Sequence, residues 1–309
     1  MNRIASNIYK YKVEMMGLAI ILIMLFHTIA PNLPYCINEI KRFGEVGVDI
    51  FLFLGGFTCA NSYMKSKSVQ SFYKKRLVRI LPAYLIIWGF IHAIFAIRYS
   101  EGFLSYLQDI SFYNVIIYND LRNWYIPAIL IMYVITPLYL KVCKHGGRVI
   151  PYILVCVFFI LFQFVGIQNK EIPFAMFWLR LPIYFIGINA FLCKDKKIIG
   201  TKYIALFAIL SIIFSYLILY YHLTEAPFQI RRFLYIPITI AFVYFFEYKS
   251  KFLFFIGGLT LELYLIHEFL QGIIWDKFSP HPLYLFVFSI SLSLICSFLI
   301  HRLLNKLHY

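Results

Sequence analysis

The sequence predicts an all-α, polytopic integral membrane protein with about ten transmembrane helices and both termini in the cytoplasm. Of its 309 residues, 62% are hydrophobic and only 14% are charged, whereas ordinary soluble domains contain about 45–50% and about 25% of these classes. Apolar runs of spanning length follow one another, and Lys and Arg gather between them. We therefore expect one transmembrane domain over residues 1–309, placed in the cytoplasmic membrane as a multi-pass protein.

The apolar runs define the predicted spans. A helix of about 20 apolar residues crosses a hydrocarbon core about 30 Å thick, and ten stretches approach that length. They are 14–31, 47–64, 80–98, 123–141, 149–168, 172–193, 203–222, 233–248, 252–274 and 283–301. Segment 99–122 is too often interrupted by polar residues such as Asp109 to span, so we expect an interfacial helix or a re-entrant cap there.

The distribution of basic residues predicts the orientation. With these spans, 20 of the 29 Lys and Arg residues lie on the side that holds both termini, 8 lie on the other side, and Arg180 lies inside a span. Cytoplasmic loops carry such an excess. Because the net charge of +15 is not collected on a soluble face, we expect no nucleic-acid partner. The six Cys form no CxxC pair, which indicates neither a disulfide framework nor a metal site.

Two ionisable residues near the external ends of the first two spans form the first candidate site. His27 ends the run GLAIILIMLFH, about four residues before the predicted end of its helix, and Asp49 lies two or three residues into the next span. Ionisable groups inside a bilayer are costly and commonly functional. A carboxylate from Asp49 would fix the imidazole tautomer that a general base needs. The alternative is a structural pair that holds two helices together.

A pair of arginines at the cytoplasmic end of the third span forms the second candidate site. Arg76 and Arg79 are three residues apart and share a helix face, and Pro82 then predicts a break or kink. Two guanidinium groups suit phosphate oxygens, and an anchor to lipid headgroups is the alternative. His27 lies about 18 Å of helix rise above the cytoplasmic rim. That distance resembles an extended pantetheine arm, so a CoA thioester bound at the arginines could reach it.

Further polar residues inside predicted spans need partners. Arg180 requires a carboxylate or a phosphate, because a lone guanidinium inside a bilayer is costly. In the ninth span, Glu262, Tyr264, His267 and Gln271 are expected to line an interior polar face. Inter-helical hydrogen bonding without catalysis is the alternative for all of them.

Five blocks of the sequence resemble acyltransferase family 3 of the membrane-bound O-acyltransferases along nearly the whole chain. The blocks are GLAIILIMLFH with His27, GVDIFLFLGGF with Asp49, RLVRILPAYL with Arg76, Arg79 and Tyr84, NWYIPAILIMYVITP with Trp124, and LTLELYLIHEF with Tyr264 and His267. Each block alone is a loose apolar pattern, but their order and spacing make the set specific. The chain departs from the family pattern at Met16, where many members carry Arg, and at Gly55, where Ser is usual.

The resemblance implies transfer of an acetyl, or similar short acyl, group from cytoplasmic acetyl-CoA to a carbohydrate hydroxyl. His27 would act as general base or transient acyl carrier, Asp49 would orient it, and Arg76 and Arg79 would hold the CoA phosphates, with Tyr84 in the same block. The acceptor would belong to a capsule, an exopolysaccharide, a lipopolysaccharide or a lipid-linked glycan. The remaining interior polar candidates are Trp124, Arg180, Glu262, Tyr264 and His267.

A transporter or flippase of a glycan or small molecule is the competing function. It would use the same polar interior without covalent chemistry. Transporters often have two related halves with interrupted helices in corresponding positions, and the sequence shows no such symmetry. A saccharide polymerase would more often carry a large external loop, and membrane acyltransferases of the other large class lack this order of blocks.

Overall fold

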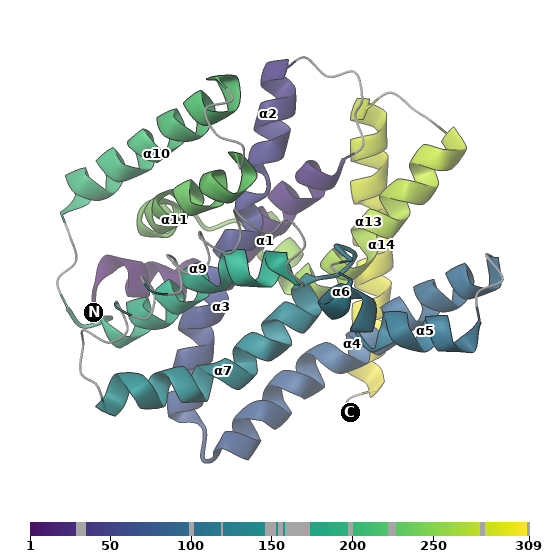
Figure 1. Cartoon of the computed structure of the whole chain (residues 1–309), viewed down its shortest axis with the longest axis horizontal. Coiled ribbons are helices and arrows are strands. Elements are labelled where there is room, and N and C mark those ends of the chain that lie inside the picture. The colour runs from purple at the N-terminus through teal and green to yellow at the C-terminus, as the bar shows by residue number, and fades with distance from the viewer. Residues whose placement is uncertain are drawn as a thin grey trace. The chain divides into compact units, whose positions relative to one another are not determined.

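The computed structural model is helical throughout its described elements, which confirms the all-α class (Figure 1). The structure describes residues 1–28, 35–98, 102–118, 120–145, 153, 157, 174–196, 200–221, 227–278 and 282–307. The predicted span 149–168 therefore lies almost wholly outside the described residues. The helices are α1 (Arg3–His27), α2 (Tyr35–Phe43), α3 (Val46–Lys65), α4 (Val69–Arg98), α5 (Phe103–Ile110), α6 (Tyr113–Ile117), α7 (Tyr125–His145), α9 (Ala175–Leu192), α10 (Thr201–Tyr221), α11 (Pro227–Phe245), α12 (Lys251–Gly258), α13 (Thr260–Phe278) and α14 (Pro282–Leu307).

Several helices have the length and apolarity of membrane spans. Within the described residues these are Asn38–Lys65, Val69–Ile94, Tyr125–His145 and Val287–Lys306. Shorter apolar helices are Met176–Leu192, Thr201–Leu217 and Phe233–Phe245. Large apolar side chains are exposed along α10 and α14, and extended exposed apolar surface is typical of faces that meet lipid. These observations identify an integral membrane protein.

The first helix ends earlier than the sequence predicted. We expected a span over 14–31, with His27 about four residues inside it, whereas α1 runs from Arg3 to His27 and His27 is its last residue. The end is closed locally, because the Thr28 hydroxyl donates to the carbonyl of Met24 at 3.0 Å. Lys41 Nζ in turn donates to the carbonyl of Thr28 at 2.8 Å. These bonds satisfy carbonyl groups that the end of a helix leaves without partners.

The run predicted as the ninth span, 252–274, forms two helices. α12 ends at Gly258, α13 begins at Thr260, and the two are bent by 79°. Hydropathy does not reveal the bend, because the apolar run is continuous across it. The glycines at 257 and 258 supply a flexible point of the kind at which helices kink. The Thr260 hydroxyl donates to the carbonyl of Gly257 at 3.3 Å, which links the two helices.

The third predicted span is part of a longer helix. α4 begins at Val69, so Arg76 and Arg79 both lie inside it, and it continues through Pro82. Two short helices, α5 and α6, follow in the segment that was expected to form an interfacial helix or a re-entrant cap. No residue of α5 is fully buried, which agrees with a position near the surface of the protein.

The contacts divide the chain into two compact units. Unit 1 contains Met1–Lys10, Asp49–Leu77 and Ser111–Glu247, and unit 2 contains Tyr11–Val48, Val78–Ile110 and Tyr248–Tyr309. Their boundaries fall within α1, α3 and α4. A single domain over 1–309 stays a prediction.

In unit 1, α3 and α9 approach closely at two glycines. A Cβ on Gly56 would clash with the carbonyl oxygen of Tyr184, and a Cβ on Gly187 would clash with that of Phe53. Small residues allow such close backbone contact between helices in a membrane. α9 also contacts α7 and α11, and α10 packs alongside α11 (Figure 1).

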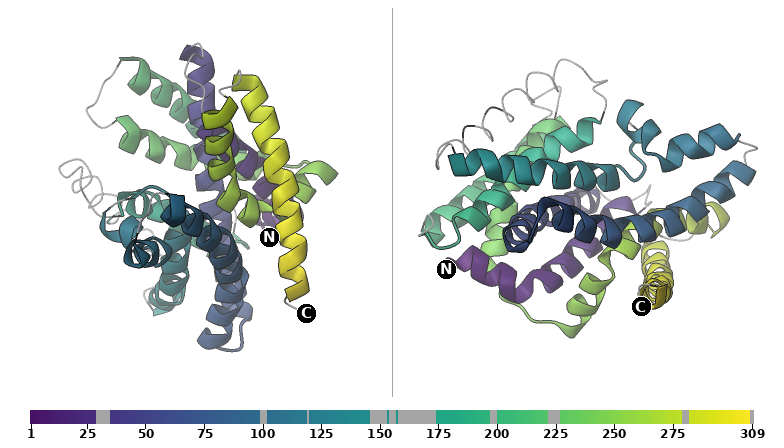
Figure 2. Two further views of the ribbon diagram at one scale, coloured as in Figure 1. Left: turned by 90° about the vertical axis from the view of Figure 1, so that its right-hand side faces the viewer. Right: turned by 90° about the horizontal axis from the view of Figure 1, so that it is seen from below.

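In unit 2, α1 and α12 meet in the same reciprocal way. Gly17 faces the carbonyl of Leu253, and Gly257 faces the carbonyl of Val13, with no room for a Cβ at either glycine. α13 and α14 lie side by side, as both views in Figure 2 show. The glycine contact therefore fixes α12 against the first half of α1.

Substitution of Gly257 tests this contact, and the neighbouring glycine provides a matched control. Gly257→Ala should destabilise the protein by about 1–3 kcal/mol, the usual cost of overpacking, because the new Cβ meets backbone that cannot move aside. Gly258→Ala should leave stability nearly unchanged, since nothing lies within 4 Å of a Cβ there. Thermal unfolding of both variants in detergent measures the difference. Equal stabilities would contradict the packing described.

Candidate functional site

A hydrogen bond between two histidines lies at the polar centre of unit 2. Nε2 of His267, on α13, is 3.1 Å from Nδ1 of His27, at the end of α1. The two ring centroids are 5.1 Å apart. His267 is 1% exposed, whereas His27 is half-buried. A buried imidazole thus supports a more accessible one.

The surroundings of His267 fix the protons of the neutral pair. Nδ1 of His267 lies 2.9 Å from the carbonyl of Leu263 and 3.0 Å from that of Tyr264. Carbonyl oxygens only accept hydrogen bonds, so this nitrogen carries the proton and Nε2 of His267 is the acceptor. His27 must then donate from Nδ1. Its Nε2 is consequently the unprotonated, basic nitrogen of the pair.

Gln271 holds α13 against the end of α1. It lies one helical turn beyond His267, is 1% exposed, and donates from Nε2 to the carbonyl of Met24 at 3.1 Å. Because Met24 offers an acceptor, the orientation of the amide is settled by this bond. Among the described residues, Oε1 of Gln271 has no hydrogen-bond partner. A buried acceptor therefore remains beside the histidine pair.

Glu262 belongs to the same helix but to a separate contact. Its Oε1 lies 2.8 Å from Nδ1 of His301 on α14, and Glu262 is 5% exposed. The ring of His301 thus lies against a buried carboxylate. Tyr264 is half-buried, and its ring centroid lies 6.1 Å from that of His267. Glu262, His267 and Gln271 are all buried.

A second His–carboxylate contact joins α4 to α5. Nδ1 of His92 lies 3.3 Å from Oδ2 of Asp109, and both side chains are largely buried. The hydroxyl of Tyr84 donates to the carbonyl of Ile110 at 3.0 Å. Tyr84, expected near the donor from its sequence block, thus attaches α5 to α4, and its role toward a donor stays a prediction.

In unit 1, Arg180 finds the carboxylate that its position required. Its Nη1 lies 2.7 Å from Oδ2 of Asp49, and the side chains are only 1% and 3% exposed. The guanidinium carbon of Arg180 also lies 5.6 Å from the centre of the Trp124 ring. These contacts join α9, α3 and the start of α7. Removal of one partner from a buried Arg–Asp pair strongly destabilises a protein, because the other charge stays buried without a partner.

Asp49 and His27, which we predicted as a pair, each have another hydrogen-bond partner. Asp49 bonds Arg180, and His27 bonds His267. Asp49 and His27 belong to different units. A role for Asp49 in orienting His27 therefore stays a prediction.

The two arginines of α4 have different surroundings. Arg76 is half-buried and donates from Nη2 to the carbonyl of Thr58 at 3.1 Å. Its guanidinium carbon lies 5.6 Å from the ring centre of Phe72 and 5.4 Å from that of Tyr133. Arg79 is exposed. Arg76 therefore helps to hold α4 against α3 and α7, while Arg79 is accessible to an anion.

The departure from the family pattern at Gly55 causes no packing defect. A Cβ there would meet the ring of Tyr184 at 3.7 Å and the side chain of Ile129 at 3.8 Å, which are ordinary contacts. A serine would fit the same space. Met16, the other departure, is half-buried on α1.

Sequence reasoning missed three pairings that involve a histidine, and two of them had a detectable signal. His92 and Asp109 lie at similar distances along the chain from the connection at 99–102, as Glu262 and His301 do from the connection at 279–281. Residues at equal distances from a short connection between antiparallel helices lie at equal depth. Comparison of depths would have found both pairs. Nothing comparable links His27 to His267.

Comparisons with known proteins show the family to which this chain belongs. Nodulation protein 10 of Rhizobium leguminosarum bv. viciae is 30% identical over 82 residues, which are 26% of this chain and 22% of that protein. The chain thus matches less than a quarter of that relative's length. No solved structure matches this chain. The sequence profile of the family described as "Acyltransferase domain" matches residues 15–302. The chain therefore belongs to acyltransferase family 3, as its sequence blocks predicted.

Proposed function

We propose that this membrane protein moves an acetyl, or similar short acyl, group from cytoplasmic acyl-CoA to a hydroxyl of a cell-surface or lipid-linked carbohydrate. The observation that carries the proposal is the hydrogen bond from Nδ1 of His27 to Nε2 of His267. It leaves a basic ring nitrogen on the residue that ends α1. Family membership supplies the reaction type, and the histidine pair supplies the general base that the reaction needs.

The proposed chemistry follows from that tautomer. Nε2 of His27 removes the proton of the acceptor hydroxyl, and the oxygen forms a bond to the thioester carbonyl carbon. The carbon–sulfur bond then breaks, and the departing sulfur takes the proton from His27 to give free CoA thiol. The products are a carbohydrate ester and CoA. While His27 is protonated, the bond from Nδ1 to His267 holds the ring in place, as an orienting partner does for a general base.

The proposed topology has ten alternating spans and cytoplasmic termini. Its support lies in unit 1, where Trp124, just before α7, lies near Arg180 toward the start of α9. At the other ends of these helices, the hydroxyl of Tyr139 donates to Oδ1 of Asn189 at 3.1 Å. α7 and α9 therefore run in the same direction. The fourth and sixth of ten alternating spans must do so.

The competing function is transport of a glycan without covalent chemistry. The basic nitrogen of His27 favours acyl transfer, because that reaction needs a general base for the acceptor hydroxyl. Comparison of the O-acetyl content of surface glycans with and without the gene separates the two functions. An unchanged O-acetyl content, with altered export of the glycan, would favour the transporter.

Replacement of His27 tests the catalytic role. His27→Ala should lower acyl transfer by about 10²–10⁴-fold, the usual contribution of general acid–base catalysis, because no other group would take the hydroxyl proton. Transfer from radiolabelled acyl-CoA to glycan in purified membranes measures the loss. His308→Ala, in the predicted cytoplasmic tail, is the control. Full activity of folded His27→Ala would refute the proposed mechanism.

Replacement of His267 tests its function as a positioning residue. His267→Ala should lower kcat by roughly 10²-fold, the cost of misplacing a catalytic group by about 1 Å, with little change in the KM for the acyl donor. His267→Gln should recover part of the activity, because its Oε1 can accept from Nδ1 of His27. A purely packing role would give equal losses in both variants.

Asp49 and Arg180 allow an orienting role to be separated from a structural one. Asp49→Asn should destabilise the protein by about 3–5 kcal/mol, because it leaves the buried Arg180 charge without its carboxylate. The double variant Asp49→Asn with Arg180→Gln should recover much of that stability. If Asp49 also orients His27, the stable double variant still has a low kcat. Normal kcat in that variant would assign Asp49 to the ion pair alone.

A further inference from the structure

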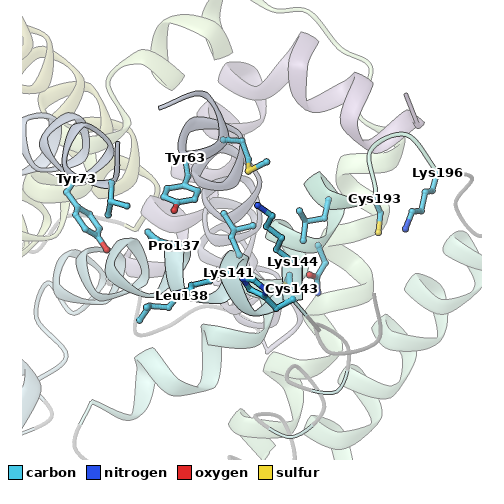
Figure 3. Close-up of a pocket in the computed structure, with 15 residues that line it drawn as sticks. Tyr63, Tyr73, Pro137, Leu138, Lys141, Cys143, Lys144, Cys193 and Lys196 are labelled. Carbon is cyan, nitrogen blue, oxygen red and sulfur yellow. The ribbon is translucent and has the colours of Figure 1, made fainter. Parts of the chain in front are cut away.

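A pocket of about 880 Å³ in unit 1 lies at the ends of four helices. Its walls come from the end of α3, the start of α4, the end of α7 and the region after α9 (Figure 3). The volume is within the usual range for small-molecule sites, about 300–1,000 Å³. None of the residue roles proposed above uses it.

The pocket is basic. Lys141 and Lys144, in the last two turns of α7, line it together with Lys196, which follows α9. Lys141 and Lys144 are three residues apart and share a helix face. Among the described lining residues none is acidic, and His145 also lines the pocket. Three lysines from two elements thus face one cavity, which is more than an isolated positive-inside anchor provides.

The pocket also has an aromatic and apolar side. Tyr63 of α3 and Tyr73 of α4 line it opposite Lys196, as Figure 3 shows. The hydroxyl of Tyr73 donates to the carbonyl of Val134 at 3.3 Å, which fixes that ring against α7. Aromatic faces pack well against planar rings. A ligand with a flat ring at one end and phosphates at the other would match both sides.

We propose that this pocket binds the adenosine 3′,5′-bisphosphate portion of the acyl donor, with Lys141, Lys144 and Lys196 on its phosphates. The proposal rests on the proposed function, because only a CoA thioester brings that nucleotide to this protein. All three lysines lie on the predicted cytoplasmic side, where CoA is dissolved. Arg76 is already bonded to the Thr58 carbonyl, so the lysines are the better placed phosphate ligands. An anionic lipid headgroup would present the same phosphate chemistry.

Two cysteines of the pocket permit a binding test that is independent of catalysis. Cys143 and Cys193 both line it, are half-buried, and form no disulfide with any described residue. In a full-length protein whose other cysteines are replaced, reconstituted in nanodiscs of neutral lipid, adenosine 3′,5′-bisphosphate should slow maleimide labelling in a saturable way. Inorganic phosphate should protect only weakly, because it does not fill the aromatic side.

Paired substitutions locate the phosphate contacts. Lys141→Gln with Lys144→Gln should raise the half-protecting nucleotide concentration by roughly tenfold or more, because charge-assisted hydrogen bonds are lost. Lys74→Gln with Lys75→Gln is the matched control, since these exposed lysines of α4 do not line the pocket and should leave protection unchanged. Thermal unfolding verifies that both pairs fold. Equal protection in both pairs would overturn the assignment.

The remaining outcomes separate this site from the proposed function. No protection by millimolar nucleotide overturns the proposal, and protection by phosphatidylglycerol nanodiscs alone makes the pocket a lipid headgroup site instead. His27→Ala should still be protected, because binding precedes chemistry. Protection of a protein that transfers no acyl group would uphold the pocket and refute the proposed function. Acyl transfer by a protein whose cysteines the nucleotide does not protect would refute the pocket assignment and uphold the proposed function.

Discussion

A polar side chain inside a bilayer must find its hydrogen-bond partner within the protein, and both units depend on this constraint. The cost of leaving such a group unsatisfied is several kcal/mol. The charge of Arg180 is paired with that of Asp49 in unit 1, and both ring nitrogens of His267 have partners in unit 2, in His27 and in carbonyls of its own helix. Each contact also determines which helices are neighbours. The histidines to which we assign the chemistry are therefore also residues that hold distant spans together.

The bend between α12 and α13 brings His267 to the end of α1. α12 packs near residue 15 of α1, and Gln271 and His267 reach Met24 and His27. Gly17 lies against Leu253 and Gly257 lies against Val13, so α12 runs antiparallel to α1, toward the first residues of α1. A straight ninth span would therefore carry His267 away from His27. The bend of 79° after Gly258 turns α13 from that course, and it links the glycine contact to the histidine pair.

The spans could be predicted from the sequence because hydropathy is a local property. The contacts between helices could not. Most of the described apolar helices lie where their runs placed them, and the need of Arg180 for a carboxylate followed from depth alone. The prediction that His27 pairs with Asp49 rests on a short connection between the first two spans, and this segment contains a helix of its own, α2, which hydropathy did not reveal. His27 and His267 come from the first and ninth spans. Nothing in one sequence orders such helices around a bundle.

The two ends of α3 in unit 1 lie beside different charged groups, a buried ion pair at its start and a basic pocket at its end. Asp49 lies near the start of α3 and Tyr63 near its end, so the ion pair and the basic pocket are about 21 Å apart along that helix. A phosphate dianion cannot follow α3 into lipid, because desolvation of an ion costs far more than one hydrogen bond returns. In the proposed mechanism, the nucleotide of the CoA donor therefore stays among the lysines at that end of α3. The neutral pantetheine arm is the part of this proposed donor that enters the membrane, so the length of the arm would limit how deep the acyl group is delivered.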